Sequence, residues 1–224
     1  MTIGQYRDDY DGEYVLTSTI IRDGKKIQER EWIDNPISNQ HISNRAAVLA
    51  SAIDEEFFNF QLLHNHRGGL FSSKKLQLYG THALKDKCNL NFMVSLDRHV
   101  LQELIDENID ENIVCYTSVK NCLRYPAHFY LIPHTPQLDE RASALYCAAF
   151  DGHKEIFLLG FHDGTSNRED KSLSAQNVNS VIAAYPGTEF YFVGHRGAVP
   201  ELWDANDNFS FMTYHNWVSY CDIG

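Results

Sequence analysis

Hydroxyl, imidazole and carboxyl side chains recur directly after the short apolar segments of this chain. The residues at these positions are Ser51, Tyr79, Gly80, Thr81, His82, Ser95, Asp97, Thr117, Ser118, His134, His162 and Asp163. Hydroxyls, imidazoles and the free amides of helix starts are groups that bind phosphate and ribose. We therefore predict a nucleotide site where these segments end. For any single Ser or Thr, the alternative is an ordinary helix cap.

Three of the eleven histidines, His82, His134 and His162, fall at the ends of predicted strands. Histidine changes its charge near neutral pH more readily than any other side chain, which suits it to general acid and base catalysis. A single histidine in such a place is usually structural. Three at one rim of a sheet raise the hypothesis that one of them takes part in chemistry.

Several motifs of well-understood chemistry do not occur in the sequence. It contains no glycine-rich dinucleotide motif, no P-loop and no Gly-x-Ser-x-Gly nucleophile motif. His64 and His66 lack a third ligand at a metal spacing. Asp97 or Asp163 could hold a divalent ion beside phosphates, but no spacing demands it, and we predict no tightly bound metal. The five cysteines include no Cys-x-x-Cys pair and are predicted to be buried, reduced thiols.

Short apolar runs alternate with amphipathic stretches from Ala46 onward. Strands are predicted over 46–50, 76–79, 91–96, 113–116, 128–132, 155–161 and 189–193, with a last strand–helix pair over 209–220. Helical spacing runs from Val100 to Ile105, an alanine-rich helix is predicted over 139–151, and a polar loop over 162–172 precedes a helix that ends at Tyr185. This alternation predicts an α/β fold with a mostly parallel sheet and helices on both faces. In such sheets, ligands bind beyond the carboxyl ends of the strands.

The first 45 residues follow a different pattern. Residues 13–21 are rich in β-branched and aromatic side chains, Asp23-Gly24 is suited to a tight turn, and 26–32 runs back. We therefore divide the chain into an N-terminal β-hairpin appendage, residues 1–45, and an α/β domain, residues 46–224. The hairpin is expected to be either an edge of the fold or an oligomer contact, and a homodimer through it is a hypothesis.

The formal net charge of −11 argues against a protein that coats nucleic acid through bulk electrostatics. One region, between His64 and Lys87, is rich in basic residues, and there Arg67, Lys74 and Lys75 are predicted to contact nucleic acid. The alternative is a solvated surface loop. No apolar run reaches the length of a membrane span, and the N-terminus lacks a signal-peptide pattern. We expect no membrane partner and a cytoplasmic location.

The segment 141–162 combines an alanine-rich helix, the sequence Gly-His-Lys-Glu-Ile at 152–156, and a strand that ends in Gly160-Phe161-His162. It resembles a signature of bacterial sialyltransferases with a single Rossmann-like domain, and of their relatives, the pterin pyrophosphokinase-like proteins. The pieces 79–84, 92–97 and 185–190 are similar to uncharacterised proteins of tailed phages. The resemblance spans residues 46–220. It implies a Rossmann-like fold, a nucleotide site that includes Gly160, and, for a phage protein, a location in the host cytoplasm.

The chain departs from this resemblance at two places. Those families carry Gly-Asn-Gly-Pro-Ser after the first strand, whereas residues 50–54 here read Ala-Ser-Ala-Ile-Asp. Without glycines, the backbone approaches a phosphate less easily. The aspartate of their Gly-x-Asp motif is replaced by His162, with Asp163 one place later. Either the nucleotide is held differently in this chain, or the site no longer catalyses.

The resemblance implies a glycosyltransferase that takes its sugar from a nucleotide sugar without a covalent link to the protein. His162 or His134, with Asp163 nearby in sequence, would then be the base that deprotonates an acceptor hydroxyl. The residues expected to hold the phosphates are Ser51, Thr81, Thr117 and Ser118. For a phage protein, the acceptor could be a hydroxylated pyrimidine of DNA, such as hydroxymethylcytosine.

Two other functions stay open. One is a catalytically silent module that binds a nucleotide or a protein, as the missing glycine loop suggests. The other is nucleotide diphosphoryl transfer of the pterin type, which would need magnesium and more paired carboxylates than the sequence offers.

Overall fold

The computed structural model describes residues 2–4, 13–34, 43–50, 58–64, 76–109, 113–133, 138–161 and 168–221. Its main feature is an eight-stranded sheet in the order β11-β10-β9-β4-β5-β6-β7-β8, in which every neighbouring pair is parallel. The strands are β4 (Arg45–Leu49), β5 (Gln77–Thr81), β6 (Phe92–Val94), β7 (Val114–Thr117), β8 (Tyr130–Leu131), β9 (Glu155–Leu159), β10 (Glu189–Val193) and β11 (Phe209–Met212). The predicted Rossmann-like α/β fold is confirmed.

The central strands consist of nearly continuous apolar residues because both faces of the sheet are buried. The side chains of 46–49 in β4 and 156–159 in β9 are at most 2% exposed. Successive residues alternate between two cores, so that Val48 packs on one face and Leu49 on the other. This double burial explains why a run of apolar residues, rather than an alternating pattern, marked these strands in the sequence.

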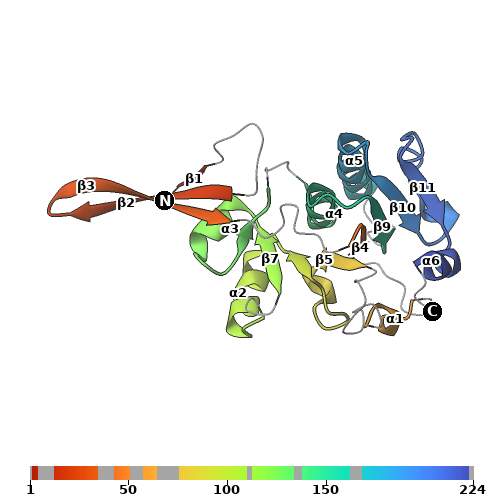
Figure 1. The fold of residues 1–224 in the computed structure, drawn as a ribbon, viewed down its shortest axis with the longest axis horizontal. Helices are drawn as coiled ribbons and strands as arrows, with labels where there is room; N and C mark the ends of the chain where they lie inside the picture. Colours follow the sequence, from red (N-terminus) through yellow and green to blue (C-terminus); the bar gives the residue numbers. More distant parts are fainter. Residues whose placement is uncertain are drawn as a thin grey trace.

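Helices cover both faces of the sheet, as predicted (Figure 1). α4 (Glu140–Phe150) and α5 (Arg168–Ala184) lie on one face, where Leu145 and Ile182 join the core. α2 (Arg98–Asp106) and α6 (Tyr214–Cys221) lie on the other, through Leu101 and Trp217. Shorter elements complete the fold: α1 (Gln61–His64), α3 (Val119–Arg124), and the 3-10 turns η1 (His82–Leu84) and η2 (Arg196–Ala198).

The chain reverses the direction in which it adds strands at the centre of the sheet. β5 to β8 are added on one side of β4, and α4 then leads back to β9, beyond which β10 and β11 follow. The covering helices change face at the same step, as crossovers of constant hand require. The ends of β4 and β9 are neighbours, because the Ala50 N–H donates to the Leu159 carbonyl at 2.8 Å. This is the topological switch point of the sheet.

The predicted N-terminal hairpin is confirmed and belongs to a separate antiparallel sheet in the order β1-β2-β3. Its strands are β1 (Thr2–Gly4), β2 (Glu13–Arg22) and β3 (Lys25–Asp34). Asp23 and Gly24 both have positive φ, 52° and 73°, which is typical of a two-residue turn between twisted strands. β1 contacts α3, and Figure 1 shows β2 and β3 reaching away from the parallel sheet.

Several predicted boundaries differ from the structure, and two of the differences have a clear physical reason. α5 begins at Arg168, so the polar loop predicted as far as Ser172 is too long, because a hydrophilic first helical turn has the hydropathy of a loop. The strand predicted over 128–132 is shorter, since β8 is an edge strand that pairs only with β7. All five cysteines are free and buried, as predicted. In the part of the chain that the structure describes, no helix is long and apolar enough to cross a membrane.

Candidate functional site

The carboxyl ends of β5, β6 and β7 form one polar rim, because these three strands are adjacent and parallel. Each strand is followed at once by polar residues that the sequence had singled out. They are Thr81 and His82 after β5, Ser95 and Asp97 after β6, and Thr117 and Ser118 at the end of β7. The helix α4 runs back across the sheet and brings its first residue, Glu140, to the same rim.

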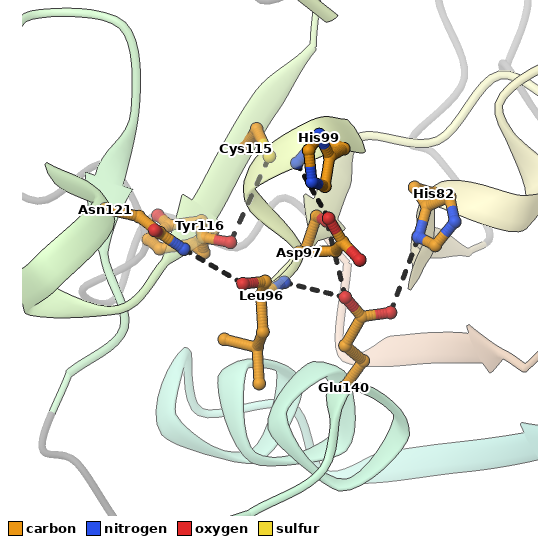
Figure 2. A network of polar contacts seen from close by, with 9 residues as sticks. His82, Leu96, Asp97, His99, Cys115, Tyr116, Asn121 and Glu140 are labelled. Atoms are coloured by element: carbon orange, nitrogen blue, oxygen red, sulfur yellow. Dashed lines mark hydrogen bonds and ion pairs between the residues drawn. The ribbon is translucent and has the colours of Figure 1, made fainter. Parts of the chain in front are cut away.

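Glu140 joins the ends of two of these strands (Figure 2). Its Oε1 accepts a 2.7 Å hydrogen bond from the Leu96 N–H and one of 3.3 Å from the Ser95 hydroxyl. Its Oε2 lies 3.4 Å from Nδ1 of His82, in an ion pair that is longer than a strong hydrogen bond. A carboxylate in the first turn of a helix also interacts favourably with the helix dipole. Glu140 is therefore held by the strand ends and by its own helix.

His82 and Glu140 stabilise each other's charged forms. Contact with the Glu140 carboxylate raises the pKa of His82 above its ordinary value of 6.5, against the opposite effect of burial. Burial raises the pKa of Glu140, but the contacts with His82 and the Leu96 N–H outweigh it, and the pKa lies below the ordinary 4.5. The His82 side chain keeps 34% of its exposure, so the imidazole is supported on one side and open on another.

The contribution of this ion pair to the free energy of unfolding should be confined to a range of pH. The raised pKa of His82 contributes stability that is complete below pH 6.5 and is lost as pH rises through the raised value. The lowered pKa of Glu140 contributes stability that is complete above pH 4.5 and is lost as pH falls through the lowered value. The stability difference between the wild type and Glu140→Gln, measured by urea denaturation, should therefore be largest between pH 4.5 and 6.5. A difference that does not vary with pH would contradict the pairing.

Asp97 begins α2 and faces the same rim. Its Oδ1 accepts a 2.7 Å hydrogen bond from the His99 N–H, which lowers the pKa of Asp97, and its charge contributes to the raised pKa of His82. Asp97 is thus a helix cap that also adds negative charge beside the imidazole.

Asn121 connects the ends of β6 and β7. Its side-chain amide donates to the Leu96 carbonyl and to the Thr117 hydroxyl, both at 3.0 Å, and it is 6% exposed. The backbone of Leu96 therefore forms two side-chain hydrogen bonds: its N–H donates to Glu140, and its carbonyl accepts from Asn121. This arrangement holds the end of β6 in one conformation.

A cavity of about 350 Å³ opens beside Leu96 and Asn121, between the starts of α2 and α3. Its lining residues are Leu96, Asp97, Arg98, His99, Ser118, Lys120, Asn121 and Arg124. Arg98, Lys120 and Arg124 supply positive charge, and the Ser118 side chain makes no cap hydrogen bond to α3. The structure thus brings the predicted residues Asp97 and Ser118 into one cavity, which is suited to an anionic ligand.

The arrangement combines two chemical capacities. The basic cavity can hold phosphate oxygens, and Leu96 connects it to the His82–Glu140 pair. An imidazole whose Nδ1 faces a carboxylate presents Nε2 as the atom that takes or gives a proton. Among the described residues, no hydrogen bond reaches the buried Thr81 hydroxyl, and the contact of Nδ1 of His82 with Glu140 is the 3.4 Å ion pair rather than a hydrogen bond. Acid–base chemistry beside a bound phosphate is what this geometry can do.

Tyr79 and Gly80, although predicted as nucleotide-binding residues, lie inside the sheet rather than at its rim. The Tyr79 hydroxyl meets Asp151 and His153, which follow α4 at the amino end of the strands. A Cβ on Gly80 would lie 3.0 Å from Leu90 and 3.2 Å from the Leu49 carbonyl. These placements give both residues a packing role. Gly160 follows β9 at the switch point with φ +71°, a conformation that favours glycine.

Replacing Gly80 with alanine should destabilise the fold by about 1–3 kcal/mol, because the added methyl group overpacks the contact with Leu90 and Leu49. Gly187→Ala is the matched control, since nothing lies within 4 Å of a Cβ at that position. Urea denaturation followed by circular dichroism measures both. Equal midpoints for the two variants would contradict the packing role of Gly80.

The remaining predicted site residues lie outside the described residues. They are Ser51, His134, His162 and Asp163 of the predicted catalytic and nucleotide sites, and Arg67, Lys74 and Lys75 of the predicted nucleic-acid contact. Ser51 directly follows Ala50, and His162 directly follows Phe161, so both come after strands that meet at the switch point. Their roles stay predictions.

Four residues of the site, Glu140, Asn121, Lys120 and Arg124, were not predicted from the sequence. A signal for Glu140 was present, since Asp139-Glu140 places two carboxylates at the start of the alanine-rich helix. A helix that leads from one parallel strand to the next starts at the carboxyl rim, so an acid at its first position reaches the site. Asn121, Lys120 and Arg124 lie on α3, which the hydropathy pattern did not indicate.

Comparison with known proteins assigns this chain to no family. No protein-family model matches the chain, and no curated protein matches its sequence. The function is therefore argued from the fold and from the rim described above.

Proposed function

We propose that this chain binds a nucleotide sugar at the carboxyl rim of its parallel sheet and transfers the sugar to an acceptor hydroxyl. The observation that carries the proposal is the His82–Glu140 pair next to a basic cavity, at the end of neighbouring parallel strands. The cavity residues bind the phosphates, and His82 acts as the base that removes the proton of the acceptor.

The position of the site in the fold supports this interpretation. Doubly wound sheets bind nucleotides outside the carboxyl ends of their strands. The rim begins at β5, next to β4, one of the two strands that form the switch point. A nucleotide that starts at the switch point can therefore extend over β5 towards His82. His162 or His134 as the base, with Asp163, stays the alternative assignment for the same reaction.

A hydroxylated pyrimidine in DNA, such as hydroxymethylcytosine, is the acceptor that we propose. Its primary hydroxyl needs only a base and a nearby sugar donor, which the rim would provide. Because the net charge of −11 repels phosphates, this acceptor requires local basic surfaces on the protein.

The direct test is to incubate the full-length protein with a panel of nucleotide sugars and a duplex that contains hydroxymethylcytosine. Release of free nucleotide and a matching mass increase of the DNA are the expected results. Stabilisation by a nucleotide without transfer to any acceptor would support a silent binding module instead. If no nucleotide raises the melting temperature, both interpretations fail.

The basic cavity makes its own prediction. Lys120→Gln combined with Arg124→Gln should weaken nucleotide binding about tenfold, or about 1.4 kcal/mol, because two charge-assisted contacts to phosphate are lost. Thermal-shift titration measures the change. Lys154→Gln combined with Lys87→Gln removes the same charge away from the cavity and should bind as the wild type does. Equal weakening in both pairs would show only a general charge effect.

A further inference from the structure

The tip of the β2–β3 hairpin concentrates positive charge without a partner. In the register of the hairpin, Arg22 lies opposite Lys25, and Ile21 lies opposite Lys26. Like charges directly opposite each other destabilise a strand pair. Among the described residues, these three basic side chains form no hydrogen bond or ion pair, and all three are exposed. The only acid in 20–27 is Asp23, in the turn.

The hairpin also holds this charge away from the acidic body. In the part of the chain that the structure describes, the ribbon beyond the three residues of β2 that pair with β1 consists of two strands and extends from the rest of the molecule (Figure 1). The five residues of β2 beyond this pairing, 18–22, span about 17 Å, which is about twice the screening length of about 8 Å at physiological salt. A polyanion at the tip therefore meets the three basic residues and not the net charge of −11.

The shape of the hairpin indicates which polyanion fits. A two-stranded β-ribbon enters the major groove of B-form DNA, whereas the major groove of an RNA duplex is too deep and narrow for side chains to read. At the tip, Ile21 is 73% exposed, and Ile27 is 37% exposed. Apolar side chains in a major groove can contact the thymine methyl group, while flanking basic residues reach the phosphates.

We propose that the β2–β3 hairpin binds duplex DNA through its tip, with Arg22, Lys25 and Lys26 on the phosphates and Ile21 in the major groove. The inference does not rest on the proposed transferase, because the binding needs no donor nucleotide. If the chain does act on DNA, the hairpin is the arm that holds it.

The test uses the full-length protein and a fluorescently labelled 20-base-pair duplex, followed by anisotropy between 50 and 200 mM salt. Three phosphate contacts predict a slope of about −2.7 for the logarithm of affinity against the logarithm of salt, or about a 40-fold loss over this range. A combined Arg22→Gln, Lys25→Gln and Lys26→Gln variant should lose most of this slope. Asp23→Asn should bind more tightly, and Asn tolerates the positive φ of that position.

The matched control replaces three basic residues elsewhere, Lys87→Gln, Lys154→Gln and Arg196→Gln, and should retain the slope of the wild type. Circular dichroism confirms that the variants are folded. The proposal is overturned if the hairpin variant binds like the wild type, or if an RNA duplex binds as tightly as DNA. It is also overturned if sedimentation shows a dimer that the hairpin variant cannot form, since the tip would then serve a second copy of the chain.

Discussion

Replacing Asp151 with alanine should destabilise the protein by about 2–6 kcal/mol, because two buried groups, Tyr79 and His153, each lose a partner at a cost of about 1–3 kcal/mol. Asp151 ends α4 and is fully buried. Its Oδ2 accepts a 3.0 Å hydrogen bond from the Tyr79 hydroxyl and lies 3.6 Å from Nε2 of His153. The same imidazole nitrogen lies 3.0 Å from the Tyr79 oxygen. Removal of the carboxylate therefore affects the buried Tyr79 hydroxyl and the buried His153 imidazole together.

The network also explains why Tyr79 stays a hydrogen-bond donor. Burial and the neighbouring Asp151 carboxylate raise the pKa of Tyr79 well above 10, so the hydroxyl keeps its proton. The Thr188 hydroxyl donates to the His153 carbonyl, which connects the network to the start of β10. A carboxylate at the carboxyl end of a helix is unfavourable for the helix dipole, and these contacts offset that cost.

Guanidinium denaturation compares the free energy lost when the whole network is disrupted with the loss when one hydrogen bond is removed. Asp151→Asn keeps an acceptor for Tyr79 and should cost less than Asp151→Ala. Tyr79→Phe should cost about 1–3 kcal/mol, because it leaves buried polar atoms without the hydroxyl. Asp86→Ala, at an exposed turn, should stay within about 0.5 kcal/mol of the wild type. An Asp151→Ala loss no larger than that of Asp86→Ala would contradict the role of the network.

Most of the sheet could be predicted from the sequence because its signal is local. A strand buried on both faces, such as β9, is a short apolar run, and α4 shows its small residues and its C-terminal glycine directly. The hairpin turn was equally readable, since Asp23-Gly24 is suited to positive φ. α3 was missed because a helix of six residues has too few turns to show a period.

The candidate site could be predicted only in part, because its decisive contacts join distant segments. That Thr81 and His82 follow a strand is visible in the sequence, and the parallel sheet places them at the rim. The contact between His82 and Glu140 depends on where α4 crosses the sheet, which no local pattern contains. Tyr79 was predicted at the rim but lies in a buried network with Asp151, although it is only two residues before Thr81 at the end of β5. A sequence pattern does not resolve such a small difference in position along a strand.

The largest effect on activity is expected at His82. His82→Gln should lower kcat of sugar transfer by about 10²–10⁴-fold, the usual contribution of a general base. His215→Gln is the control, because this histidine is exposed on α6, away from the rim. Quenched-flow or steady-state measurement of nucleotide release compares them. Full activity of His82→Gln would reject this base, and a loss confined to His162→Ala would favour the alternative.

The variant Glu140→Gln tests whether Glu140 sets the pKa of the base His82 or only contributes to the structure of the rim. Without the carboxylate, burial is the main remaining influence and lowers the pKa of His82. A base works in its unprotonated form, so the acid limb of kcat/KM against pH should move to lower pH, while the maximal rate falls. The amide oxygen that this substitution introduces can still accept from the Leu96 N–H, which preserves the rim. A purely structural role would lower the rate without moving this limb, and the direction of its shift therefore decides the role of the pair.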